Sequence, residues 1–81
     1  MTVLAREQQG NNVLIMRLLD EPVYGRFYTE GGRRFSSSRY ELEHRWLSPS
    51  GGVQGNDFTF WRATEAKRMI AAGLFNSVQL F

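Results

Sequence analysis

"NVLIMRLL", residues 12–19, is the stretch that indicates which kind of fold this chain adopts. In a β-strand successive side chains point to opposite faces, so both faces of this segment would be apolar. Val13, Ile15 and Leu19 would lie on one face, and Leu14, Met16 and Leu18 on the other. Such a strand is typical of the interior of a sheet. A helix is the competing interpretation, but the short length and the flanking turn residues favour a strand.

The segments on either side of this strand also show the alternation of a sheet. In "RYELEHRWL", residues 39–47, Tyr40, Leu42, His44 and Trp46 would share one face and the charged residues the other. The sequence "DEP" at 20–22 predicts a tight turn, and "SSS" at 36–38 predicts an irregular or edge segment. We therefore predict strands at residues 2–7, 12–19, 23–29, 39–47, 57–61 and 77–81, with a loop over 48–56.

The hydrophobic period changes from two to 3.6 residues near Ala63. Apolar or small residues recur at helical spacing and form one stripe, consisting of Ala66, Met69, Ile70, Gly73 and Leu74. We expect Thr64 or a residue just before it to cap this helix, and Gly73 or Asn76 to end it. The sequence thus predicts one α+β domain over residues 1–81: a small antiparallel sheet of four to six strands, with one helix of the C-terminal half packed on it.

The composition argues against catalysis and against a metal or cofactor. The chain has no cysteine and one histidine, His44, which we interpret as a half-buried strand residue beside Leu42 and Trp46. The glycines of "GGVQGN", residues 51–56, precede a strand-like segment, whereas a phosphate loop would lead into a helix. We therefore expect no enzyme activity. The apolar runs are too short to span a bilayer and no signal peptide is recognisable, so we expect a cytoplasmic protein without membrane contact.

Basic charge is concentrated in one segment, residues 24–40. It contains four arginines and Glu30 as its only acid, a local net charge of +3 within a chain of +2, which leaves −1 for the remainder. Alternation would place Tyr24, Arg26 and Tyr28 together on the outer face and Val23 on the core face. Arginine and tyrosine are enriched at interfaces, and both also contact nucleic acid. The sequence thus predicts a partner-binding surface composed of Tyr24, Arg26, Tyr28, Arg33, Arg34 and Arg39, with Arg33 and Arg34 on a loop. An ordinary exposed sheet face is the alternative.

Two resemblances bear on the partner. The segment "YELEHRWLSPSGG…FTFWRATEAKRMIAAG", residues 40–73, resembles the hairpin-then-helix layout of the arm-type DNA-binding domains of phage integrases. This resemblance implies a sheet that enters the major groove. In the present hairpin, however, Glu41 and Glu43 alternate with Arg39 and Arg45, so its outer face would be nearly neutral.

The second resemblance is to the small phage-encoded anti-CRISPR proteins. It rests on the size of the chain, the absence of cysteine, and the "TEAKRMIAAG" helix, residues 64–73, laid on a short meander. It implies an inhibitor that binds a nucleoprotein complex stoichiometrically and blocks the surface that engages nucleic acid. Because the chain outside residues 24–40 is slightly acidic, we favour a protein or nucleoprotein partner over direct DNA or RNA binding. The third alternative is that the chain is a purely structural subunit of a larger assembly. The sequence does not indicate an oligomeric state.

Overall fold

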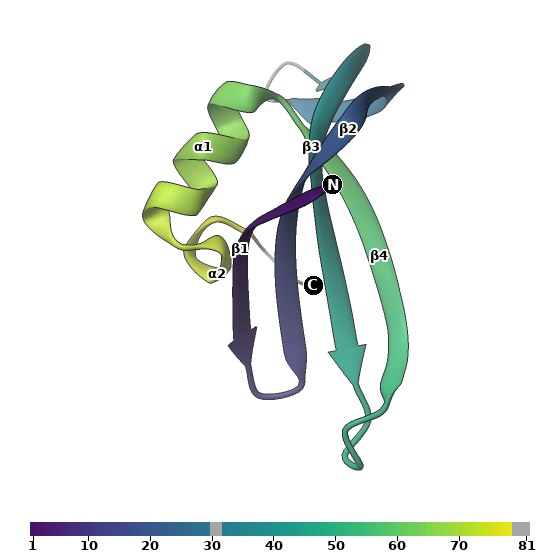
Figure 1. Ribbon diagram of the computed structural model, residues 1–81, viewed down its shortest axis with the longest axis vertical. Helices are drawn as coiled ribbons and strands as arrows, with labels where there is room; N and C mark the ends of the chain where they lie inside the picture. The colour runs from purple at the N-terminus through teal and green to yellow at the C-terminus, as the bar shows by residue number, and fades with distance from the viewer. Residues whose placement is uncertain (30–31, 79–81) are drawn as a thin grey trace.

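The computed structural model describes the backbone of residues 1–29 and 32–78 and the side chains of residues 1–23 and 38–78. Four antiparallel strands pair in chain order to form one sheet, and both helices lie on the same side of it (Figure 1). The elements are β1 (Thr2–Gln9), β2 (Asn12–Thr29), β3 (Gly32–Leu47), β4 (Val53–Trp61), α1 (Ala63–Ala72) and α2 (Leu74–Ser77). The predicted α+β fold, with a helix of the C-terminal half against an antiparallel sheet, is confirmed.

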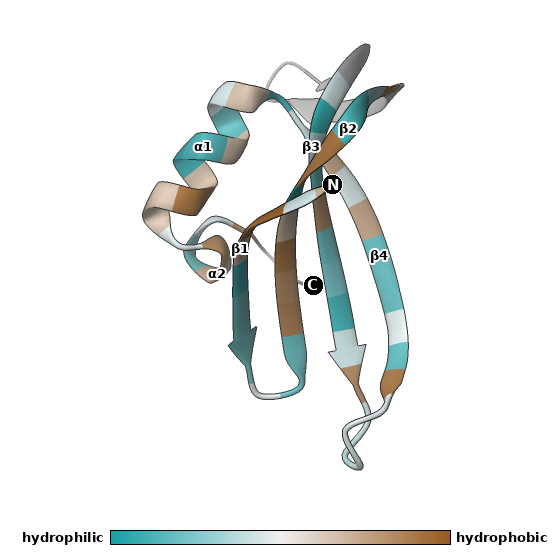
Figure 2. Ribbon diagram, in the orientation of Figure 1, coloured by the Kyte–Doolittle hydropathy of each residue, from teal (hydrophilic) through white to brown (hydrophobic). Residues whose placement is uncertain are grey.

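The core lies between α1 and the sheet. Met16 on β2 and Leu42 on β3 pack against Met69 of α1, and all three side chains are buried. Figure 2 shows the apolar stretch of β2 that supplies part of this core. The other buried members of the cluster are Leu14, Ala66 and Leu74. Ile70, which also belongs to the predicted stripe, is only partly buried.

β2 is buried on its second face as well, although the described helices cover only the first. Val13 is 1% exposed and Ile15 is 4% exposed. In register, Gln8 and Arg45 flank Val13, while Arg6 and Glu43 flank Ile15. Long side chains such as Gln8, Arg6 and Arg45 cover apolar neighbours with their aliphatic parts while their polar ends reach water, whereas Glu43 is itself buried. The prediction of an interior strand that is apolar on both faces is thus confirmed.

Gly73, one of the two residues predicted to end the helix, is where α1 ends. Its φ of 89° lies in the left-handed region that glycine adopts without steric cost. The chain then turns into α2, and the backbone N–H of Leu74 donates a 2.5 Å hydrogen bond to Oε2 of Glu7 on β1. At the start of α1 the cap position is occupied by Arg62, one of the residues just before Thr64, but Arg62 makes no side-chain capping bond. The bond to Glu7 fixes the end of the helical segment on the sheet.

The strand β2 continues where a turn was predicted. Instead of turning at residues 20–22, it runs from Asn12 to Thr29, with a register shift between Leu18 and Val23. β3 likewise passes through Ser36–Ser38 without a break, because β2 provides a partner for each of these serines. Val23, which we expected on the core face, is 37% exposed. Long-range pairing has overridden the local turn signal in β2. Residues 36–38 of β3 are regular rather than irregular, but they do lie at an edge, because among the described residues β4 does not pair with β3 beyond Tyr40.

Two further predictions at the ends of segments were wrong. Residues 53–56 belong to β4 and not to the preceding loop, because they pair with the end of β3. Ser77 belongs to α2, where its hydroxyl donates to the carbonyl of Gly73, so no strand begins there. The remainder of the predicted closing strand, residues 79–81, lies outside the described residues.

Gly55 provides a test of the β3–β4 register. It pairs with Trp46, and a Cβ added at Gly55 would lie 2.4–2.8 Å from three atoms of the indole ring. We expect Gly55→Ala to displace the ring, to cost about 1–3 kcal/mol in the free energy of unfolding, and to shift the tryptophan fluorescence. The matched control is Gly52→Ala, where the nearest atom is 3.7 Å away in Ser48. Equal stability of the two variants would contradict the predicted contact.

Candidate functional site

A two-stranded ribbon extends beyond the four-stranded part of the sheet. The pairing of β1 with β2 ends at Leu18, and the pairing of β4 with β3 ends at Tyr40. Beyond these positions, among the described residues, β2 and β3 pair only with each other, from Val23 opposite Ser38 to Thr29 opposite Gly32. We call residues 23–29 and 32–38 the β2–β3 ribbon. It carries most of the predicted binding residues.

The backbone register of the ribbon brings the predicted residues into one element. Tyr28 pairs with Arg33, and Arg26 and Tyr24 lie further along the same strand. Arg33 and Arg34 belong to β3 and not to a loop, which corrects the prediction. The side chains of Tyr24, Arg26, Tyr28, Arg33 and Arg34 lie outside the described residues, so the prediction of a shared outer face for them stays a prediction.

Arg39 is the one predicted binding residue whose side chain is described. It is exposed, and its Nε donates a 2.9 Å hydrogen bond to the carbonyl of Leu19. The neighbouring acid, Asp20, has a pKa below its ordinary value. The main causes are a hydrogen bond from the amino group of Met1 and the charge of that group, and the charge of Arg39 contributes further. Arg39 is therefore oriented by the backbone of β2 and stands beside an exposed carboxylate.

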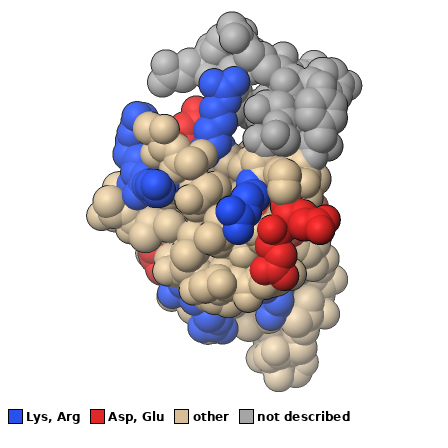
Figure 3. Space-filling model, turned by 45° about the horizontal axis from the view of Figure 1, so that its top comes forward, with Lys and Arg blue, Asp and Glu red and all other residues tan. Residues whose placement is uncertain are grey.

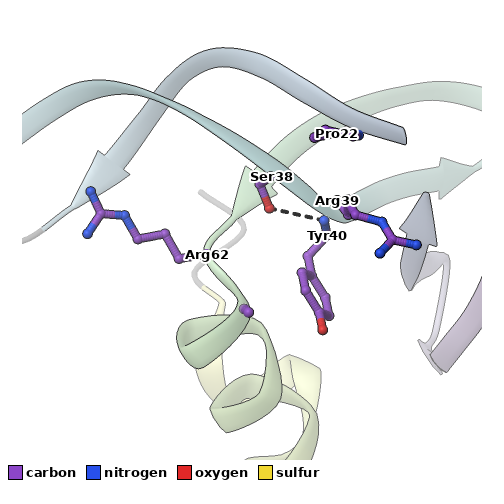
Figure 4. A pocket seen from close by; sticks show the side chains of 6 residues that line it. Pro22, Ser38, Arg39, Tyr40 and Arg62 are labelled. Carbon is purple, nitrogen blue, oxygen red and sulfur yellow. Dashed lines mark hydrogen bonds between the residues drawn. The ribbon is translucent and has the colours of Figure 1, made fainter. Parts of the chain in front are cut away.

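A shallow groove of about 330 Å³ lies at the base of the ribbon, where it meets the start of α1. Buried Ser38 organises this junction: its hydroxyl donates to the carbonyl of Trp61 and accepts a 3.0 Å hydrogen bond from the N–H of Tyr40. Figure 4 shows Arg39 and Arg62 pointing in opposite directions from the groove, with the Tyr40 ring beside α1. The groove is lined by Pro22, Ser38, Arg39, Tyr40, Arg62 and Ala63.

Arg62 is a residue of this junction that the sequence did not single out. It is exposed and precedes α1 directly, and it stands at the same groove as Arg39 although it is 23 positions later in the chain. The periodicity of "DFTFWRATEA", residues 57–66, gives no signal for this arrangement, because the folding of β4 back onto β3 creates it. On the face drawn in Figure 3, basic and acidic side chains of the described residues lie side by side.

Two other arginines of the sheet, Arg17 and Arg45, form ion pairs with carboxylates. Arg17 lies 2.8 Å from Oε1 of Glu43 and 3.2 Å from Oε1 of Glu41. Arg45 donates two 3.0 Å hydrogen bonds to Glu43, and Asn56 donates a third of 3.2 Å. These arginines and carboxylates neutralise one another on the sheet face opposite α1. Arg17 and Arg45 are therefore bound within this ion cluster of the sheet, whereas Arg39 and Arg62 at the base of the ribbon are exposed.

The buried carboxylate of this cluster is strongly acidic. Burial on its own raises the pKa of Glu43, but hydrogen bonds from Arg45, Arg17 and Asn56 outweigh burial and lower the pKa to about 2. Glu43 is 2% exposed and remains ionised at neutral pH. A carboxylate held in this state is a poor general base, because it has little affinity for a proton.

His44 has neighbours consistent with a structural role. Its Nε2 lies 2.9 Å from Oδ1 of Asn12, and its ring lies 5.2 Å from that of Trp46 at a tilt of 50°. In the described part of the chain, no three His, Asp or Glu side chains are grouped so that they could hold a metal ion. None of the described helices is long and apolar enough to cross a bilayer.

Comparison of this chain with protein-family models, with curated proteins and with solved structures finds no match.

Proposed function

We propose that this chain is a small non-enzymatic binding protein that docks stoichiometrically on a protein or nucleoprotein complex. The observation that carries this proposal is the β2–β3 ribbon, which continues beyond both of its neighbouring strands. Its sequence contributes Arg26, Arg33 and Arg34, while exposed Arg39 and Arg62 stand at its base. A projecting element of this kind can enter a recess on a partner. Only the ribbon then has to be complementary to the partner in shape and charge, and the rest of the domain does not.

The groove at the base favours a protein component in the partner. It combines apolar surface from Pro22 and Tyr40 with two arginines, and interfaces between proteins combine such groups. Exposed Asp20 and Glu21 precede Pro22 in the chain, and Asp20 lies within the electrostatic reach of Arg39. Carboxylates at this position would repel the phosphates of a nucleic-acid backbone, which disfavours binding of a continuous strand. They would complement a protein surface that carries charges of both signs.

The resemblance to anti-CRISPR proteins suggests the consequence of this docking. The bound chain acts as an inhibitor because it covers the surface with which a host nucleoprotein complex engages DNA or RNA. This role requires no catalysis by the chain, and its effect saturates at one inhibitor per complex. It therefore predicts stoichiometric titration of the activity of the complex and no turnover.

We expect the combined variant Arg26→Ala, Arg33→Ala and Arg34→Ala to bind the partner at least about 30-fold more weakly, since loss of an interface hot spot costs about 2 kcal/mol or more. Its melting temperature should change little, because changes of surface residues alter stability by about 0.5 kcal/mol. The measurement is capture of the partner from a nuclease-treated host lysate on the immobilised chain, followed by titration of the purified partner. Arg6→Ala on β1, exposed and outside the ribbon, is the matched control. If the triple variant binds the partner as tightly as the parent, the ribbon is an ordinary exposed sheet face and not the binding surface.

Direct nucleic-acid binding is the second candidate, and the shape of the ribbon favours it. The major groove of B-DNA admits a two-stranded antiparallel ribbon, so we assign this candidate function to the β2–β3 ribbon in place of the β3–β4 hairpin. The test is fluorescence anisotropy with bare duplex DNA and single-stranded RNA over a range of salt concentrations. Affinity that falls steeply with salt, and that the triple arginine variant loses, would replace the first candidate with this one.

A further inference from the structure

The two edges of the sheet differ in how well they are protected. β1 forms one edge, and its pairing is interrupted by a register shift between Val3 and Ala5. It also carries exposed Arg6 and is tied to α2 through the bond from Leu74 to Glu7. A bulge, a charge and a covering helix are devices by which proteins prevent an edge from pairing with another chain.

β4 forms the other edge and has few of these devices. Its sequence, "VQGNDFTFW", contains no lysine, arginine or proline, and Asp57 is its only charge. It pairs regularly with β3 from Gly55 to Trp61, the register shift being confined to its start. Phe58 is 49% exposed, and within the described residues no strand pairs with the outer side of β4. A regular, weakly charged edge with an exposed aromatic residue is a template for strand addition.

We propose that two copies of this chain pair through β4 in antiparallel orientation, with Phe58 opposite Phe58 of the second copy. The pairing of residues 55–61 then places Asp57 opposite Thr59 in both directions, so no like charges face each other. A register centred on Asp57 would overlap more residues, but it would bring two carboxylates directly opposite, which is destabilising. The sequence of β4 is thus self-complementary in the register centred on Phe58, and this selects a second copy as the occupant.

The proposed pair would form one continuous sheet with a two-fold axis perpendicular to it. Residues opposite each other in a sheet point to the same face, so α1 of both copies would lie on one side. Phe58 shares the other side with its β3 partner Glu43, and there the two phenyl rings would meet. Because the strands run antiparallel, the two β2–β3 ribbons would project from opposite ends. The proposal does not depend on what the ribbons bind.

The pairing is expected to be weak and dependent on concentration. A single added strand on each side gives an interface below the roughly 1,200 Å² of stable complexes, so we expect a dissociation constant of about 10–100 μM. The chain has no cysteine, which makes a single introduced thiol a clean probe of the register. Opposite Cβ atoms in an antiparallel pair are about 4.5–5.5 Å apart, within reach of a disulfide after a small adjustment.

The experiment compares Phe58→Cys with Val53→Cys under mild oxidation at about 100 μM, near the expected dissociation constant. Val53 is the control because it is 60% exposed on the same strand but lies outside the proposed overlap. We expect Phe58→Cys to form disulfide-linked dimer about tenfold faster. Equal rates for the two variants overturn the proposed register.

Sedimentation of the unmodified chain tests the pairing without a thiol. We expect dimer to accumulate up to about 0.5 mM and to be lost in Phe58→Lys, which introduces two facing cations. A monomer throughout this range overturns the proposal. A dimer that survives Phe58→Lys also overturns it, because the association would then use another surface.

Discussion

Replacing Met69 with aspartate is expected to unfold the domain. Met69 is 6% exposed and packs in the cluster formed by β2, β3 and α1. An aspartate there would bury a charge with no partner among the surrounding apolar side chains, at a cost of more than about 4 kcal/mol. The total stability of a domain of this length is about 4–12 kcal/mol, so this one change removes most or all of it.

The neighbouring residue offers a matched control for this prediction. Arg68 is exposed on the same helix, and Arg68→Asp introduces the same side chain on the solvent side. It should cost about 1 kcal/mol or less, from helix propensity and local charge. Circular dichroism during thermal or urea unfolding measures both variants. A cooperative transition of Met69→Asp near that of the parent would show that α1 does not pack through this face.

Removing the buried carboxylate of β3 is expected to have the second largest effect. Glu43 accepts hydrogen bonds from Arg45 and Asn56, and its Oε1 lies 2.8 Å from Arg17. Glu43→Ala would leave two guanidinium groups without their shared counter-ion, one of them with a side chain only 16% exposed. Breaking a buried ion pair by removing one partner costs about 3–5 kcal/mol. Urea unfolding at neutral pH measures this loss, and Glu21→Ala, at an exposed position, is the control.

The same group should make stability depend on pH. The pKa of Glu43 is about 2 in the folded chain and 4.5 as the ordinary value, so the unfolded chain takes up the proton more readily. The stabilisation is therefore fully present above about pH 4.5 and is lost as the pH falls toward 2, by about 3 kcal/mol in all. Glu43→Gln should remove this contribution and flatten the profile in that window. A variant that loses stability on acidification as steeply as the parent would contradict the assignment.

The helix and the interior strand could be predicted because their signals are local. A side chain's place in a period of two or 3.6 residues depends only on its immediate neighbours, and the buried positions Leu14, Met16 and Met69 follow from that pattern. The end of α1 could be narrowed to Gly73 or Asn76 for the same reason, since the ability to adopt a positive φ is a property of one residue, and the structure has Gly73 there. The basic segment, residues 24–40, likewise follows from the composition alone and requires no knowledge of which strands pair.

The errors lie where a distant strand supplied the hydrogen bonds. Residues 20–22 carry turn signals, yet β2 passes through them because β3 offers partners on both sides of the register shift. For the candidate site, the sequence identified Arg39 but not Arg62, because these two meet at one groove only after β4 has paired with β3. Neither the continuation of β2 through residues 20–22 nor the placement of Arg39 and Arg62 at one groove can be read from adjacent residues in the sequence.

By itself, the sequence determined the α+β class, the two-sided burial of β2, the stripe of α1 and the concentration of arginine in residues 24–40. Only the tertiary structure decided which charges stay at the surface. In "RYELEHRWL", residues 39–47, Glu43 and Arg39 share the charged face of one alternating strand and look equivalent. Glu43 is buried because Arg17, from another strand, and Asn56, from a third, converge on it, whereas Arg39 lies beyond the last β4 pair and remains exposed. Burial of a charge depends on partners that are distant in sequence, since an ion leaves water only where other groups replace its hydration.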